Sequence, residues 1–580
     1  MESGLDEKES TRESLLERQK RKGGLRTMPF IIANESFEKV ASFGLAPNMI
    51  KYLMNDYHMD MATGSNVLFL WNAANNLTPV FGAFIADSYV GRFRMIGLGS
   101  IVSFLGMVLL WSTTVVPQAR PPPCDQSTYT CLPPSALQLT LLCCSFGLLS
   151  LGAGGIRSSS LAFGADQLDT KYGLKNARAM ESYFGWYYFW ATFSVLLAMS
   201  CIVYIQDNSG WAFGFGVPAM LMFLATLSFF LASPFYVKLM ANSGLIRGLV
   251  QVVVASVRNR HISLSSQGED VLYHSKRGSM LQLPSEKLRF LNKACIIQDP
   301  LHDLTPDGMA SNPWTLCTVD QVEELKALIK IIPLWTTGIM VSVSISQPSF
   351  PLLQATSMDR HVTPNFEIPA ASFGMFVVIS AMLWIVLYDR VILPVASKIM
   401  KKPVYLSAKQ RMGIGCLLSF IAMAVTAVVE GIRRTNAIEV AHNNSEMRTA
   451  MSALWLVPQY WLCGLAEASN AVAQNEFYFS ELPRSMSSVA ANLIGVSMGA
   501  ASLLAGFILS TIDDVTGSGE RESWISSDIN KGHYDYYFWI LSGLSLVNFM
   551  YFLACSKAYG PGVGEGQRAW DAGEEEIREE

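Results

Sequence analysis

Charged residues are scarce in this sequence. Asp, Glu, Lys and Arg make up 16% of its 580 residues, whereas a soluble globular protein carries about a quarter. The formal net charge is only −4, so the composition indicates no nucleic-acid partner. The 10 cysteines form no CxxC pair of the kind that binds zinc. We find no nucleophile–base pair and no cluster of metal ligands, so the sequence predicts neither an enzyme nor a bound cofactor.

Long apolar runs take the place of charge, and 51% of the residues are hydrophobic. A membrane-spanning helix needs about 20 mostly apolar residues, because the hydrocarbon core is about 30 Å thick. In lipid, only helices and closed barrels satisfy the backbone hydrogen bonds. We therefore predict an all-α membrane protein whose twelve transmembrane helices lie in the lipid bilayer at about 29–52, 63–87, 94–116, 137–164, 182–206, 211–240, 327–354, 369–393, 406–430, 450–480, 488–512 and 534–556.

The spacing of these spans divides the chain into two six-helix halves, at 29–240 and 327–556. A polar linker, 241–326, separates them, an arrangement similar to the major facilitator fold. Within the linker, residues 244–258 are apolar with basic ends. They predict a helix that either lies on the membrane surface or packs against the rest of the protein. The remaining segments are a charged tail, 1–28, without the features of a signal peptide, and an acidic tail, 557–580.

Positive charge predicts the orientation, because cytoplasmic loops are rich in Lys and Arg. Cytoplasmic termini place most loop Lys and Arg inside, with Arg433 and Arg434 as exceptions. Asn443, in an Asn-Asn-Ser triplet, then lies outside and is a candidate glycosylation site. Cys124 and Cys131 share a Pro-rich outer loop, where they form either a disulfide or two free thiols. The plasma membrane is the expected location, with the vacuolar membrane as the alternative.

Three ionisable residues fall within the first predicted span: Glu35, Glu38 and Lys39. Their offsets of three and four residues place them on one helical face. A charge inside a bilayer is costly unless it faces a cavity and has a partner. Glu35 and Lys39 can pair across one turn, which leaves Glu38 to take up a proton or to reach another helix. We therefore predict a proton-coupling site on this face.

Charge also occurs in two later spans, which occupy equivalent positions in the two halves. The fourth span carries Arg157 after a run of glycines that permits close helix approach or a local break. The tenth carries Glu467 and Glu476, which point in roughly opposite directions. Arg157 cannot lose its proton in practice, so we predict either a fixed positive site for an anion or a partner for Glu38. Arg157 and Glu476 lie at similar depths and can face each other, while Glu467 packs or holds a neighbouring helix. Buried amides, including Gln474, are weaker candidates because they often only join helices.

Taken together, these residues resemble the proton-coupled oligopeptide transporter family, and specifically its plant nitrate/peptide branch. The resemblance covers nearly the whole chain apart from the tails and the linker. The matching elements are the first-helix ExxER element at 35–39, with Lys39 in the Arg position; the loop Gly82–Arg92; the fourth-helix region Gly154–Arg157 with Phe163–Gln167; and the tenth-helix groups Val457–Gln459, Glu467-Ala468 and Gln474–Phe477.

The resemblance implies that Glu35, Glu38 and Lys39 handle the proton. It also implies that Arg157 and Glu476 contact the substrate and form a charge pair that breaks and re-forms during transport. Lys39 and Arg157 depart from the family, which has Arg and usually Lys there. Lys39 weakens planar recognition of a carboxylate but can itself titrate.

We predict a proton-coupled symporter that moves a small anionic or zwitterionic solute into the cytoplasm by alternating access. Nitrate is the first choice, because two inner cations suit a small anion. The alternatives are di- or tripeptides, carboxylate plant hormones, and a sensor that keeps the fold without transporting.

Overall fold

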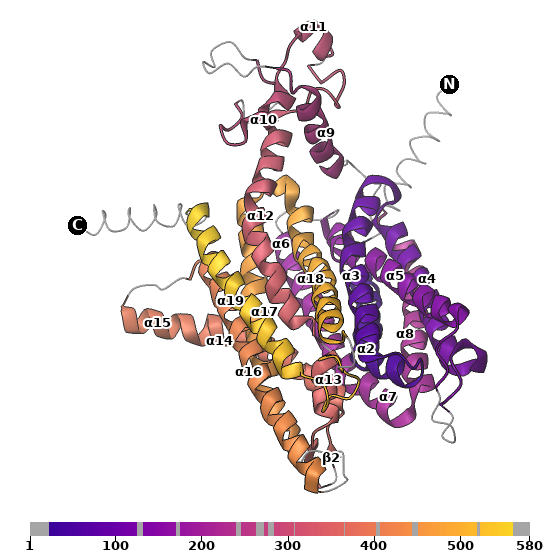
Figure 1. Ribbon diagram of the computed structural model, residues 1–580. Coiled ribbons are helices and arrows are strands. Elements are labelled where there is room, and N and C mark those ends of the chain that lie inside the picture. The colour runs from indigo at the N-terminus through magenta and orange to yellow at the C-terminus, as the bar shows by residue number, and fades with distance from the viewer. Residues whose placement is uncertain are drawn as a thin grey trace, which may run out of the picture.

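The computed structural model is an almost entirely helical protein (Figure 1). It describes residues 23–124, 131–169, 175–238, 245–262, 272–275, 283–306, 308–347, 349–364, 366–401, 406–443, 451–518 and 522–560. In the first half, indigo to magenta in Figure 1, the helices are α2 (Met28–Asn55), α3 (Met61–Ile85), α4 (Arg92–Val115), α5 (Ala136–Asp169), α6 (Lys175–Leu197), α7 (Val203–Ser209) and α8 (Trp211–Leu231).

The second half, pink through orange to yellow, repeats this pattern of long helices. It contains α12 (Val319–Ile345), α13 (Ser349–Thr356), α14 (Met375–Leu387), α15 (Leu393–Met400), α16 (Ala408–Asn443), α17 (Val457–Glu481), α18 (Ser487–Thr516) and α19 (Tyr534–Tyr559). Single π-helical turns join α6 to α7 and α14 to α15. The two short strands β1 (His361–Thr363) and β2 (Phe366–Glu367) form a hairpin far from the linker.

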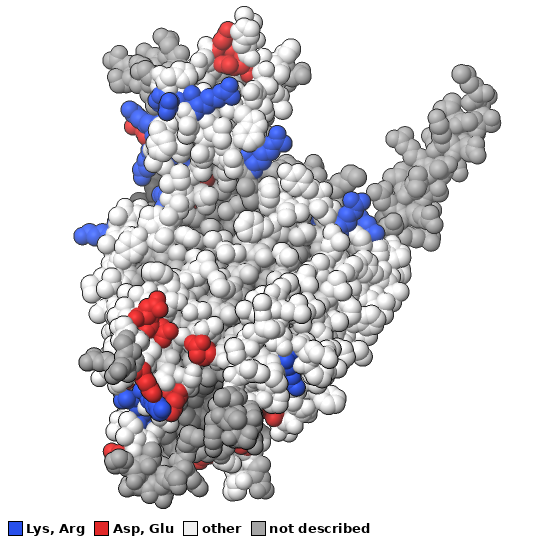
Figure 2. Space-filling model, turned by 45° about the vertical axis from the view of Figure 1, so that its right-hand side comes forward, with Lys and Arg blue, Asp and Glu red and all other residues white. Residues whose placement is uncertain are grey.

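In the described part of the chain, nine helical segments are long and apolar enough to cross a membrane. The other three long helices that correspond to predicted spans, α2, α3 and α17, fall outside this set. Among them, α2 carries Glu35, Glu38 and Lys39, and α17 carries Glu476. Figure 2 shows a wide band with few charged side chains across the middle of the molecule, and Lys and Arg gathered towards the linker. The all-α membrane fold is therefore confirmed.

Several predicted boundaries differ from the structure, and two of the differences have a clear local cause. The seventh span, expected at 327–354, begins earlier, at Val319, where Thr318 and Gln321 form a capping box. It is also interrupted between α12 and α13 around Gln347. The sixth span ends at Leu231 rather than at 240, because Pro234 enters a short 3-10 turn and cannot continue the helix.

Glycines bring α4 and α5 into close contact. A Cβ on Gly152 would lie 2.4 Å from the backbone nitrogen of Ser103, and one on Gly99 would lie 2.8 Å from the carbonyl oxygen of Gly152. Gly154 packs in the same way against Thr78 of α3. Since α5 is one continuous helix, the glycines before Arg157 serve close packing and not a break.

The two halves meet along α3 and α18. The amide of Asn66 donates to Ser510 Oγ at 2.9 Å, and Leu77 packs against Gly499. The halves also meet at a second place, where the hydroxyl of Ser372 in the second half donates to the carbonyl of Met199 in the first half at 2.9 Å. The halves therefore touch through small and polar residues, which lets helices approach closely.

The linker helix α9 (Leu245–Arg258) packs beside the projecting end of α12, together with the short helices α10 (Arg289–Asn292) and α11 (Pro300–Asp303) further out (Figure 1). Leu249, Val252 and Ala255 are buried in the core of the second half. This face confirms the packing alternative for 244–258. The opposite face exposes Val250, Val253 and Val257, and its contact with a membrane surface stays a prediction.

Candidate functional site

A two-point ion pair joins α2 to α5 in the first half. Arg157 donates from Nε to Glu38 Oε2 at 3.0 Å and from a terminal nitrogen to Glu38 Oε1 at 2.9 Å. The hydroxyl of Ser42, one turn along α2, donates to the same carboxylate at 2.5 Å. Glu38 is fully buried, whereas the side chain of Arg157 is 18% exposed. The guanidinium therefore keeps one side open to other partners.

Glu35 and Lys39 form the second pair of this site, as their spacing on one helix predicts. Lys39 Nζ lies 3.5 Å from Glu35 Oε1. Glu35 is 3% exposed, and its second oxygen is buried without a hydrogen-bond partner among the described residues. Lys39 and Arg157 both lie over the ring of Phe43, at 5.7 and 5.5 Å from its centroid. The cations of the two ion pairs thus lie over the same aromatic ring.

Polar contacts hold α2 in this position. The Asn34 amide and the Ser100 hydroxyl of α4 exchange hydrogen bonds at 3.1 and 3.2 Å. From the other side, Tyr187 of α6 lies next to Glu35 and is buried. Tyr183 reaches over Gly164, where a Cβ would collide with its hydroxyl. Two aromatic side chains of α6 therefore pack against the site.

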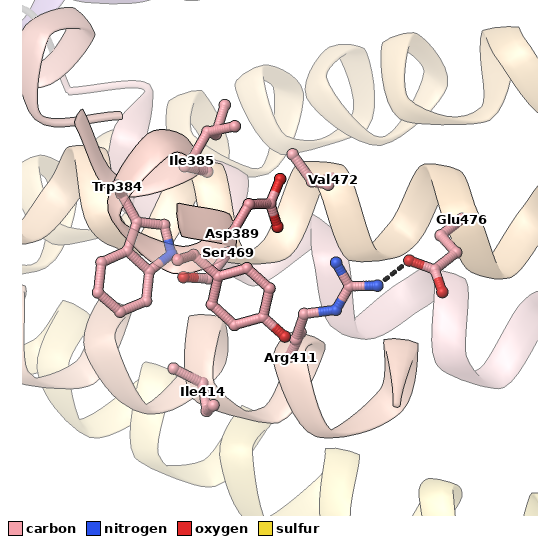
Figure 3. Close-up of a pocket in the computed structure, with 10 residues that line it drawn as sticks. Trp384, Ile385, Asp389, Arg411, Ile414, Ser469, Val472 and Glu476 are labelled. Atoms are coloured by element: carbon pink, nitrogen blue, oxygen red, sulfur yellow. Dashed lines mark hydrogen bonds and ion pairs between the residues drawn. The ribbon is translucent and has the colours of Figure 1, made fainter. Parts of the chain in front are cut away.

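Glu476 has a different partner from the predicted one. Arg411, at the start of α16, forms an ion pair with it (Figure 3). The two residues line a cavity of about 310 Å³ between α14, α16 and α17. The predicted Arg157–Glu476 pair is not formed in this structure, because Glu38 holds Arg157 and Arg411 holds Glu476. Arg411 is one of the loop Lys and Arg residues that the charge rule places in the cytoplasm, and nothing in its spacing along the chain indicated this contact.

The other predicted residues fall outside these two clusters. Gln474 is buried against Gly338 of α12, and its amide nitrogen has no hydrogen-bond partner among the described residues. Glu467 is half-buried in α17. Cys124 and Cys131 are joined by a disulfide, which decides between the two alternatives for that loop. Asn443 ends α16, but its side chain and the rest of its triplet lie outside the described residues.

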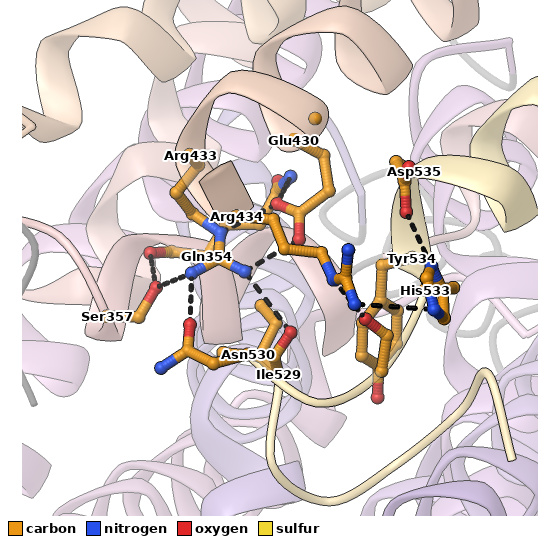
Figure 4. Close-up of polar contacts among 12 residues, drawn as sticks. Gln354, Ser357, Glu430, Arg433, Arg434, Ile529, Asn530, His533, Tyr534 and Asp535 are labelled. Carbon is orange, nitrogen blue, oxygen red and sulfur yellow. Dashed lines mark hydrogen bonds and ion pairs between the residues drawn. The ribbon is translucent and has the colours of Figure 1, made fainter. Parts of the chain in front are cut away.

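One buried ionic cluster was not predicted as a site. Glu430 and Arg433 of α16, both fully buried, pair at 2.7 Å. Arg433 also donates to Ser357 and Asn530, and Gln354 donates to Glu430 at 2.7 Å (Figure 4). The sequence interpretation treated Arg433 as an exception to the charge rule. Its spacing of three residues from Glu430 was the available signal.

Comparison with known proteins identifies the family. Residues 93–525 match the sequence model of PTR2, the POT family. The chain is 53% identical over 573 residues to "Protein NRT1/ PTR FAMILY 1.2" of Arabidopsis thaliana, covering 97% of this chain and 94% of that protein. It is 52% identical over 572 residues to "Protein NRT1/ PTR FAMILY 1.1" of the same plant, covering 97% of each.

Solved structures agree on the fold. "In meso crystal structure of the POT family transporter PepTSo" superimposes with a TM-score of 0.66 at 18% identity, covering 92% of this chain and 98% of that one. "Crystal structure of auto inhibited POT family peptide transporter" gives 0.64 at 17% identity, covering 92% and 97%. At these identities the likeness shows the shared fold and leaves the solute open.

Proposed function

Because the chain belongs to the POT family of membrane transporters, we propose that it is a proton-coupled symporter that carries a small anion, nitrate first, by alternating access. Its relatives are transporters and not enzymes. The proposal adds the coupling residues, the solute and the direction of transport to that shared activity.

The observation that carries the proposal is the pair between Glu38 and Arg157. A carboxylate that accepts two hydrogen bonds from one guanidinium holds it strongly. A proton on Glu38 removes the negative charge, and the pair then loses its ionic attraction. Arg157 cannot lose its own proton, so it becomes a fixed positive charge that needs an anion. Proton uptake thereby creates the solute site, which couples the two events.

Glu35 and Lys39 supply the second ion pair of this coupling. Their contact of 3.5 Å is longer than either Glu38–Arg157 bond, and Lys39 lies beside Arg157 over Phe43. Two cations about one ring suit a small anion better than one does, which favours nitrate. A peptide would need Glu476 for its amine, and that carboxylate is held by Arg411.

The same proposal includes an orientation. We place the linker 241–326 and both tails in the cytoplasm, with the loop of Cys124 and Cys131 on the opposite side. A disulfide in that loop supports this placement, because disulfides persist in oxidising spaces. The plasma membrane remains the first choice of location.

Uptake into proteoliposomes tests the proposal. With an inwardly directed proton gradient, the wild type should accumulate labelled nitrate, and dissipating the gradient should stop accumulation. Glu38→Gln and Glu35→Gln should lose gradient-driven uptake. The matched control is Glu286→Gln, because the Glu286 side chain is 85% exposed in the linker, and it should transport like the wild type.

A competition panel of nitrate, dipeptides and carboxylate hormones separates the solutes. Nitrate should compete best for the labelled substrate. Gradient-driven uptake that persists in both glutamine variants would refute the coupling, and uptake of none of these solutes would favour a sensor.

A further inference from the structure

The cavity between α14, α16 and α17 has an excess of negative charge. The site of Glu38 and Arg157 does not account for it. The cavity wall carries two carboxylates, Asp389 and Glu476, and one guanidinium, Arg411, so the sum is −1. Arg411 is already engaged, since it pairs with Glu476 and lies 5.7 Å from the ring centroid of Tyr388. Asp389 has neither a hydrogen bond nor an ion pair with any described residue. Figure 3 shows its carboxylate at the cavity, on the side away from Glu476.

The side chain of Asp389 is exposed, and an exposed charge within a membrane-spanning segment is costly unless it has a partner. Asp389 lies within Ala370–Met400, one of the segments apolar enough to cross a membrane. Charges in such segments face a cavity and have partners by default. Here the cavity is present and no described residue pairs with Asp389, which points to a positively charged ligand.

The remaining wall is suited to an organic body rather than a metal ion. Trp384 and Tyr388 line one side, with ring centroids 6.3 Å apart. The face of an aromatic ring attracts an ammonium group, and Trp does so most strongly. Ser469 lines the same cavity and is 6% exposed, and its buried hydroxyl has no hydrogen-bond partner among the residues that the structure describes. Buried polar groups are rarely left unsatisfied, so this hydroxyl also points to a missing ligand.

We propose that this cavity binds an organic cation, with its ammonium group at Asp389 and its apolar body against Trp384 and Tyr388. The volume of about 310 Å³ is within the range of small-molecule sites. The site is separate from Glu38 and Arg157, and its ligand has the opposite charge to the proposed solute. Binding here does not depend on the proposed transport of an anion.

Titration calorimetry on the full chain in nanodiscs of zwitterionic lipid tests the site. The probes are benzyltrimethylammonium and phenethylammonium, with phenylacetate as an anion of similar size. Both cations should bind saturably and phenylacetate should not. Asp389→Asn should weaken cation binding by about tenfold or more, since hydrogen bonds and contacts to charged groups are the strong ones. Trp384→Ala should weaken it by about tenfold through the lost ring.

Two further variants make the result decisive. Asp389→Glu keeps the charge and should retain binding, which separates loss of charge from misfolding. Arg390→Gln alters the neighbouring exposed residue, which does not line the cavity, and should bind both cations like the wild type. Cation binding that is unchanged in Asp389→Asn overturns the proposal. So does binding of phenylacetate that is lost in Arg411→Gln, because that result identifies an anion site. Absence of saturable cation binding to the wild type also overturns it.

Discussion

The two halves each bury a pair of one Glu and one Arg joined by two hydrogen bonds, but the surroundings of the pairs differ. Arg157 contacts Glu38 across two helices, and its side chain is 18% exposed. Arg433 contacts Glu430 within α16 and is fully enclosed. Arg433 also donates to Ser357, Asn530 and the carbonyl of Ile529. In the part of the chain that the structure describes, Arg157 donates hydrogen bonds to Glu38 alone.

This difference separates a pair that can open from one that cannot. Buried ion pairs add stability only when further hydrogen bonds satisfy the remaining groups. The Glu430 pair meets that condition and ties α16 to α13 and to the loop before α19 (Figure 4). The Glu38 pair has one open side, so a proton or a solute can replace one partner. We infer that the Glu430–Arg433 pair stabilises the second half and that the Glu38–Arg157 pair opens and closes during transport.

Glu430→Gln should have the largest effect, because it leaves the enclosed guanidinium of Arg433 without a countercharge. Removing one partner of a buried pair costs about 3–5 kcal/mol. We expect a large fall in the amount of folded protein and in its melting temperature, measured by size-exclusion chromatography after heating. A variant that melts like the wild type would mean that the two pairs do not differ in this way.

Gly152→Ala tests the comparison through helix packing. The Glu38–Arg157 pair joins two helices and depends on where α5 lies, whereas Glu430 and Arg433 lie on the same helix. The substitution should therefore disturb only the first of these pairs. The new Cβ would lie 2.4 Å from a backbone atom of Ser103. Overpacking of this kind costs about 1–3 kcal/mol. Gly147→Ala on the same helix is the control, because nothing lies within 4 Å of its Cβ. We expect lower melting temperature and uptake only in Gly152→Ala.

The sequence predicted those parts of this contrast that depend on spacing along one helix. The Glu35–Lys39 pair follows from an offset of four, and the need of Glu38 for a partner on another helix follows from the cost of an isolated charge in lipid. The all-α fold and the twelve long segments follow from apolar length. The charges of Arg157 and Glu476 inside predicted spans marked both as further site residues, and the family resemblance then implied their contacts with the substrate.

The partners chosen across helices could not be read from the chain. Arg411 and Glu476 are 65 residues apart, and their contact depends on how α16 lies against α17. Arg433 looked like a misplaced loop charge because the ninth span was ended at 430, whereas α16 continues to Asn443. Hydropathy marks where a helix enters the membrane, but not how far it projects beyond it. Tertiary packing decided both cases.

Glu38→Gln should destabilise less than Glu430→Gln, although it abolishes coupled uptake. The guanidinium of Arg157 is partly exposed, so it can find water when its carboxylate is lost. We expect a cost of about 1–2 kcal/mol, typical of a lost charged hydrogen bond. Melting temperatures of the two variants, measured side by side, test this order. Equal losses would show that Glu38 is as structural as Glu430.

His533→Gln should have the smallest effect. It tests the loop before α19 in the second half. Burial and the nearby Arg434 lower the pKa of His533 from 6.5, against the opposing effect of Asp535. The folded state therefore binds fewer protons than the unfolded state, so stability falls as the pH drops through 6.5 towards that lowered pKa. Because the His533 side chain is 33% exposed, solvent keeps this loss small.

The measurement is the drop in melting temperature between about pH 8 and about pH 5. The drop should be slightly smaller in His533→Gln than in the wild type, whereas His302→Gln, in the exposed linker helix α11, should match the wild type. The comparison uses the change with pH, because the lost stacking of His533 on Tyr536 at 4.9 Å lowers the variant at both pH values. A larger drop in His533→Gln would mean that His533 gains a proton on folding. Its contribution to stability would then rise, not fall, as the pH drops.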